Sequence, residues 1–133
     1  MLFDVRLLVP DDALPTYALA RLREPTLSPQ AWAAELARPV AEEGTFAAFC
    51  GSTPRGLLRY MLARAAAGAE VFVIRWVTAF DLIDPQRVAE DLIAAVRERE
   101  ALAGRVTAWA PGVPSGPGFD SAVAEDAVLH SVL

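Results

Sequence analysis

The sequence predicts a single α+β domain in which helices flank a mixed sheet. Residues 70–80, EVFVIRWVTAF, are rich in β-branched and aromatic residues and apolar on both faces, which is typical of a strand at the centre of a sheet. Residues 85–102 follow with apolar side chains at helical spacing, which predicts a helix packed on one face of that sheet. With 133 residues, 54% hydrophobic and 22% charged, the chain is expected to form one domain over positions 1–133.

A strand and a first helix are expected at the N-terminal end. Residues 3–9 alternate partly between apolar and polar side chains, which indicates a strand that ends at Pro10. Asp11 or Asp12 can cap the helix that we predict over residues 13–23, because a carboxylate accepts hydrogen bonds from the free amides of a first helical turn.

A second helix is expected directly afterwards. Ser28 is a suitable N-cap, and Pro29 is favoured at the first helical position because its missing amide hydrogen costs nothing there. The apolar spacing predicts one buried face for each of the three helices. These faces comprise Leu14, Tyr17, Ala18 and Leu22 in the first helix, Trp32, Leu36 and Val40 in the second, and Val88, Ala89, Leu92, Ala95 and Val96 in the third.

Residues 57–67 are compatible with two structures. Their leucines and methionine have helical spacing, which local pattern favours, but the same residues also suit a strand of a meander. The flanking pattern is clearer, because TFAAFC at 45–50 indicates a short strand and GSTPRG at 51–56 indicates a turn. RVTAWA at 105–110 predicts a further strand.

The last part of the chain has a different composition. Residues 111–118, PGVPSGPG, predict a rigid and irregular connection. The tail over residues 119–133 can be read as a helix, although its final residues AVLHSVL would also form a strand.

Composition limits the classes of partner. The net charge is −5 and the twelve basic residues are scattered arginines, so we expect no nucleic-acid partner, because phosphate binding needs a concentrated basic face. No apolar run approaches the roughly 20 residues of a membrane span, and the first residues lack a basic signal region, so we expect no membrane association and a cytoplasmic location. Cys50 is the single cysteine and ends an apolar run, which predicts a buried structural thiol and no multi-cysteine metal site.

The order of these patterns resembles the GNAT acyltransferases. The resemblance is carried by VRLLVPDDA, TFAAFC-GSTPRG-LLRYML, VFVIRWVTAF and AEDLIAAVRERE, taken in this order, and covers roughly residues 3–109. It implies a GNAT-like, mostly antiparallel mixed sheet flanked by helices, with residues 57–63 as a strand. It also implies acetyl-CoA or another acyl-CoA as cofactor and an amine, on a small molecule or a protein, as acceptor.

The family signature, Gln/Arg-x-x-Gly-x-Gly/Ala, lies at the start of the long helix, where its backbone amides hold the pyrophosphate of the cofactor. In this sequence it falls on Asp84, Pro85, Gln86, Arg87, Val88 and Ala89. Only Ala89 conforms. The resemblance makes Arg87, Val88 and Ala89 the candidate cofactor-binding residues.

The departures from the signature predict weakened or lost acetyl-CoA binding. We expect Asp84 to be the N-cap of the helix, with Ile83 and Val88 forming a hydrophobic staple. Its carboxylate would compete with a phosphate for the same donors, and Pro85 supplies no amide hydrogen. Arg87 could replace the lost amide contacts with a charge-assisted one.

The catalytic positions of the family are incompletely matched. The general acid is often a tyrosine that follows the fifth strand, whereas the tyrosines here are Tyr17 and Tyr60, both earlier. The general base is often a carboxylate on the central strand, which makes Glu70 and Asp81 the candidates, although acids at strand ends are usually only solvated. Arg75, within the same strand, is interpreted as an arginine paired with a carboxylate or reaching the rim of the sheet, in preference to one that contacts a ligand.

The short segment after the fifth strand implies that the last two strands of the family are missing or reduced to AVLHSVL. An exposed sheet edge would result, and proteins rarely leave such an edge unpaired. We therefore expect a homodimer, or an edge covered by residues 119–133.

Three functions remain open from the sequence. The first is an acyl-CoA-dependent N-acyltransferase homologue with weakened or lost cofactor binding. The second is a non-catalytic GNAT-fold binding or assembly module. The third is a small α/β regulatory domain unrelated to GNATs, which requires residues 54–67 to be a helix. A V-shaped cleft between the strands that hold Trp76 and Trp109 would favour the first.

Overall fold

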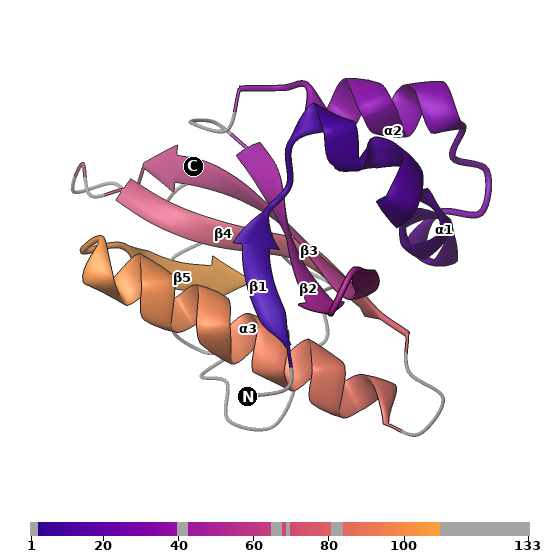
Figure 1. Cartoon of the computed structure of the whole chain (residues 1–133). Helices are drawn as coiled ribbons and strands as arrows, with labels where there is room; N and C mark the ends of the chain where they lie inside the picture. Colours follow the sequence, from indigo (N-terminus) through magenta and orange to yellow (C-terminus); the bar gives the residue numbers. More distant parts are fainter. Residues whose placement is uncertain (1–2, 40–42, 65–67, 69, 81–83, 110–133) are drawn as a thin grey trace.

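The computed structural model describes residues 3–39, 43–64, 68, 70–80 and 84–109 (Figure 1). Its elements are β1 (Asp4–Leu7), a 3₁₀ turn (Pro10–Asp12), α1 (Ala13–Arg23), α2 (Pro29–Leu36), β2 (Glu43–Cys50), β3 (Thr53–Arg64), β4 (Glu70–Ala79), α3 (Pro85–Leu102) and β5 (Val106–Trp109). The five strands form one sheet in the order β1-β2-β3-β4-β5. The pairs β1–β2, β2–β3 and β3–β4 are antiparallel, and β5 is parallel to β4. This confirms the predicted α+β class with a mixed, mostly antiparallel sheet.

The helices cover the two faces of the sheet separately. Figure 1 shows α3 along one side of the sheet and α1 with α2 on the other. Two buried clusters follow this division. The first joins Leu92, Ile93 and Val96 of α3 to strand residues such as Phe72, and the second joins α1 and α2 to Ala47, Phe49 and Leu57. Alternate residues of β2 and β3 therefore pack against opposite layers, as the pleat of a strand requires.

Residues Thr53–Arg64 form a strand, so the local preference for a helix was wrong and the strand implied by the resemblance is confirmed. β3 pairs with β2 on one side and β4 on the other, and this pairing satisfies its backbone along both edges. The turn before it is also shorter than the expected 51–56. It is confined to Gly51 and Ser52, and Gly51 has a φ of 64°, a conformation that glycine adopts at no steric cost.

The helix α1 has the predicted bounds but a different buried face. Its buried residues are Thr16, Leu19 and Ala20, whereas Leu14 is 83% exposed and Leu22 is 56% exposed. The reason is a polar contact that periodicity cannot show. The Thr16 hydroxyl donates to the Asp12 carbonyl at 2.6 Å and accepts from the indole nitrogen of Trp32 at 3.0 Å, which holds this side of α1 against α2.

The expected features of α2 and α3 are largely confirmed. The Ser28 hydroxyl caps α2 by accepting from the Ala31 amide at 3.0 Å, and Trp32 and Leu36 are buried. Val40 lies outside the described residues. In α3, Val88, Leu92 and Val96 are buried as expected, together with Ile93 and Glu100, whereas Ala89 and Ala95 are only half-buried.

Strand β4 is an interior strand of the sheet, but the middle position belongs to β3. The register between them shifts, because Arg59 lies opposite Trp76 while Tyr60 lies opposite Ile74. Arg75 is therefore the extra residue of a β-bulge. β5 pairs with Val71–Ile74 alone, so β4 continues past the last described pair of the two strands. The residues after Trp109, which would complete the expected cleft between Trp76 and Trp109, lie outside the described part.

The Cys50 side chain is exposed, so the predicted buried thiol was wrong. Cys50 stands at the end of β2, directly before the Gly51 turn, and the apolar run that precedes it turns out to end at the surface. Within the described ranges, no helix is both long enough and apolar enough to span a membrane.

Candidate functional site

At the start of α3, the helix's own residues occupy or remove backbone donors that could bind a phosphate. Asp84 is the N-cap, and its Oδ1 atom accepts from the Arg87 amide at 3.1 Å, as the sequence predicted. Pro85 is the first helical residue and has no amide hydrogen. One free donor of the first turn is thus taken by a carboxylate and another does not exist. This turn fits a pyrophosphate poorly, because a phosphate would meet a negative charge and a reduced set of amides.

The other residues of this turn lie in different environments. Val88 is 1% exposed and packs toward β3, where a Cβ atom on Gly56 would come within 3.2 Å of it. Gln86 donates to Glu90 at 3.1 Å, within the helix. The Arg87 side chain is 71% exposed, with its Nε atom 4.0 Å from a carboxylate oxygen of Asp91. Arg87 is therefore the cofactor candidate whose side chain is free to meet a ligand. Ile83, the proposed staple partner, lies outside the described residues.

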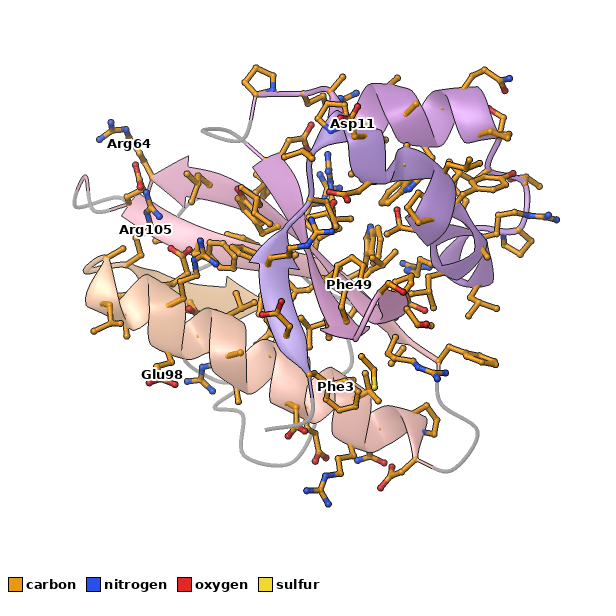
Figure 2. The ribbon with its side chains drawn as sticks, in the orientation of Figure 1. Phe3, Asp11, Phe49, Arg64, Glu98 and Arg105 are labelled. Carbon is orange, nitrogen blue, oxygen red and sulfur yellow. The ribbon has the colours of Figure 1, made fainter. Side chains whose placement is uncertain are left out.

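The candidate base Glu70 lies at the opposite end of β4 from the start of α3. It begins the strand, and its carboxylate accepts from Arg105 at 2.5 Å, while Arg105 also donates to Glu100 at 2.8 Å. Figure 2 shows Arg105 and Arg64 at the edge of the molecule away from α1 and α2. The structure therefore does not bring Glu70 together with Arg87. Asp81 lies outside the described residues, and the catalytic role of both acids stays a prediction.

A cavity of about 360 Å³ lies on the other face of the sheet, between α1, α2 and strands β2, β3 and β4. Its lining includes two tryptophans, four arginines and three glutamates. These are Trp32, Trp76, Arg23, Arg38, Arg59, Arg75, Glu24, Glu35 and Glu43. We call this cavity the arginine pocket. A group of this kind in a concave site is a candidate for ligand binding.

Arg59 is the centre of a buried ion-pair cluster in the wall of the arginine pocket. It is 3% exposed, and its guanidinium donates to the Thr45 hydroxyl at 2.9 Å and to a Glu35 carboxylate oxygen at 2.8 Å. A carboxylate oxygen of Glu43 lies 3.4 Å from the same guanidinium, and Arg38 donates to the other oxygen of Glu43. These contacts join β3 to β2 and α2, and they match the two glutamates of the wall with two arginines.

The Glu43 carboxylate is held in its ionised form. Burial raises its pKa, but the hydrogen bond from Arg38 and the charges of Arg59, Arg38 and Arg75 lower it further, and the net pKa lies below the usual value. A carboxylate with a lowered pKa that is already engaged by two guanidinium groups is a weak proton acceptor. Glu43 therefore serves as a structural anion in this wall.

Of the two sequence interpretations of Arg75, the pairing with a carboxylate is not found among the described residues. Its side chain is exposed and lines the arginine pocket, and among the described residues it makes no hydrogen bond or ion pair. The sequence interpretation also missed the cluster around Arg59. A signal was present, because Arg59 interrupts the apolar strand LLRYML, and a buried arginine requires carboxylates nearby. Within the described ranges, no group of three metal-ligating side chains is placed to bind a metal.

Several solved structures are similar to this one. A ribosomal-protein-alanine N-acetyltransferase from Brucella melitensis biovar Abortus 2308 is 14% identical, with a TM-score of 0.70 over 86% of this chain and 82% of that one. An aminoglycoside N-acetyltransferase in complex with CoA is 16% identical, with a TM-score of 0.65 over 92% and 82%. A Trypanosoma brucei acetyltransferase is 19% identical, with a TM-score of 0.63 over 86% and 84%.

No protein-family model and no curated protein matches the sequence. The similarity therefore lies in the fold, because these acetyltransferases superpose on most of this chain at low sequence identity. The chain has the GNAT fold.

Proposed function

We propose that this protein is a GNAT-fold homologue of the N-acyltransferases in which acetyl-CoA binding is weakened or lost. The observation that supports this is the 3.1 Å hydrogen bond from the Arg87 amide to the Asp84 carboxylate, at the helix start where the family holds the pyrophosphate. Each phosphate-to-amide bond that is missing removes a charge-assisted contact. A dissociation constant near or above the millimolar range corresponds to only about 4 kcal/mol of binding free energy.

The test compares the natural protein with a variant that restores the family signature, Asp84→Arg/Pro85→Gly/Arg87→Gly. Acetyl-CoA binding is measured by calorimetry, after circular dichroism shows that α3 is retained. We expect weak or undetectable binding to the natural protein and tighter binding to the variant. Arg87→Gly alone is the matched control, because it removes the one exposed cation of the turn while Asp84 and Pro85 remain.

Two results would contradict parts of this proposal. Micromolar binding of acetyl-CoA by the natural protein, weakened by Arg87→Gly alone, would make Arg87 the phosphate ligand. It would contradict the proposal that cofactor binding is weakened or lost. If neither the natural protein nor the variant with the restored signature binds acetyl-CoA, the cause of the lost binding lies outside the start of α3.

A second candidate function is a non-catalytic binding module. The arginine pocket favours it, because the pocket is lined by α1, α2 and β2–β4, with no contribution from the start of α3. Loss of cofactor binding would therefore leave this pocket intact. The third function, a regulatory domain unrelated to GNATs, required a helix over residues 54–67, and the strand Thr53–Arg64 contradicts it.

A further inference from the structure

The charges around the arginine pocket do not cancel. Its described lining has one more arginine than glutamate, within a chain whose net charge is −5. Glu35 and Glu43 are already matched by Arg38 and Arg59 through short contacts. Neither glutamate is therefore available to a cationic ligand. The pocket is a local site of positive charge on an acidic protein.

The excess charge is carried by Arg75. Of the remaining lining residues, Arg23 and Glu24 at the end of α1 carry one charge of each sign and so add no net charge. Arg75 approaches Glu43 closely enough to lower the pKa of that carboxyl, yet it forms no hydrogen bond or ion pair within the described residues. A guanidinium with five donors and no described acceptor is suited to pair with a carboxylate or phosphate from outside.

The β-bulge explains why this arginine faces the pocket. Consecutive side chains of a regular strand point to opposite faces, but Arg75 and Trp76 both line the same cavity. The register shift between Arg59 and Tyr60 leaves Arg75 as the extra residue of β4. Bulges re-aim side chains in this way and recur beside functional sites. The β-bulge thus sets the face of the sheet from which the Arg75 side chain projects.

An apolar surface adjoins the cation. Trp76 is half-buried, and its ring centroid lies 6.5 Å from that of Trp32, which is 2% exposed. The two rings give the pocket an aromatic wall beside Arg75. A cavity of about 360 Å³ is within the range of sites that hold small organic molecules.

We infer that the arginine pocket binds a small organic anion, whose carboxylate or phosphate pairs with Arg75 while its apolar body rests against Trp76. The pocket and the start of α3 lie on different faces of the sheet. The inference therefore stands whether or not acetyl-CoA binds.

The first experiment titrates the natural protein with four probes of similar shape. Benzoate and phenyl phosphate carry the two anionic groups, benzamide is neutral, and benzylammonium is cationic. Binding is followed by tryptophan fluorescence and calorimetry. At least one anion should bind about tenfold more tightly than benzamide, and its binding should weaken as salt is added. The tighter of the two anions identifies carboxylate or phosphate as the natural group.

The second experiment uses Arg75→Gln, with Arg64→Gln as a matched control. Arg64 is an exposed arginine of the same β3–β4 hairpin at the end away from α1 and α2, so the two variants lose the same charge (Figure 2). Arg75→Gln should weaken anion binding about tenfold with benzamide binding unchanged, and Arg64→Gln should leave both unchanged.

Three outcomes would overturn the inference. The first is benzamide or benzylammonium binding as tightly as the anions. The second is equal loss of anion binding in both arginine variants, which would indicate a general charge effect. The third is no binding of either anion up to about 10 mM, which is weaker than any specific site of this size should show. The comparison of probes on the natural protein decides the first and third even if a variant folds poorly.

Discussion

A guanidinium nitrogen of Arg59 lies 2.8 Å from a carboxylate oxygen of Glu35, and this contact ties the middle of β3 to α2 across the wall of the arginine pocket. The same guanidinium reaches Thr45 on β2, so one buried cation connects three elements. The pocket owes its shape to this cluster, because α2 would otherwise contact the sheet mainly through Trp32 and Leu36.

Replacement of Arg59 by methionine should destabilise the protein by about 3 kcal/mol, because it leaves two carboxylates in the wall without their buried partner. The free energy of unfolding is measured by urea denaturation. Arg38→Met is the control. Its side chain is 56% exposed and contacts the same glutamates, so its loss should cost clearly less than the loss of Arg59. Equal costs for the two variants would contradict the central role of Arg59.

Leu92→Ala should cost about 2–5 kcal/mol, because Leu92 is fully buried between α3 and the sheet and its removal leaves a cavity. Leu102→Ala is a matched control on the same helix, where the side chain is 86% exposed and the change should stay within about 0.5 kcal/mol. Thermal or urea unfolding measures both. A loss below about half a kcal/mol for Leu92→Ala would mean that α3 packs through another face.

The contact between Arg6 and Asp12 predicts a dependence of stability on pH. Both Asp12 oxygens accept from Arg6 at 2.9 Å, and one also accepts from the Val9 amide at 2.8 Å. The hydrogen bonds from Arg6 lower the pKa of Asp12 despite the opposing effect of burial. On acidification, Asp12 is therefore protonated at a higher pH in the unfolded chain than in the folded one. The stabilisation is complete above the unfolded pKa of about 3.9 and is lost as pH falls below it.

Asp12→Asn should accordingly lower the free energy of unfolding by about 1 kcal/mol at neutral pH, and the difference from the natural protein should shrink as pH falls below about 4. Asp11→Asn serves as the comparison, because Asp11 is exposed and accepts no side-chain hydrogen bond among the described residues. A difference that grew on acidification would have the wrong sign for this linkage.

The outer edge of β5 should be covered, either by a second copy of the chain or by the C-terminal residues. Among the described residues β5 pairs with β4 alone, and Val106 is 51% exposed. We predict a homodimer, or an edge covered by residues 119–133, because an open strand edge invites pairing. Light scattering gives the mass, and hydrogen exchange of the tail gives its protection. A strictly monomeric protein with a fully unprotected tail would be inconsistent with both.

The sequence by itself determined the elements whose signals are local. Ser28 and Asp84 are caps with their partners three residues away, and the start of α3 follows from its cap and Pro85. The chemistry at the start of α3 could be predicted for the same reason, because the Asp84 cap and the missing amide hydrogen of Pro85 are properties of adjacent residues. The bounds of α1 were also predicted, although its N-cap Asp12 makes no side-chain capping hydrogen bond.

Only the tertiary structure decided the features that depend on distant partners. The residues from Leu57 onward have helical spacing but lie in the strand Thr53–Arg64, because pairing with β2 and β4 outweighs local preference. Thr16 is buried because Trp32 supplies a donor. The arginine pocket combines three strands with α1 and α2, and its key orientation depends on a register shift at Arg75. No local pattern encodes that shift, because it arises where two strands of unequal residue count must stay paired.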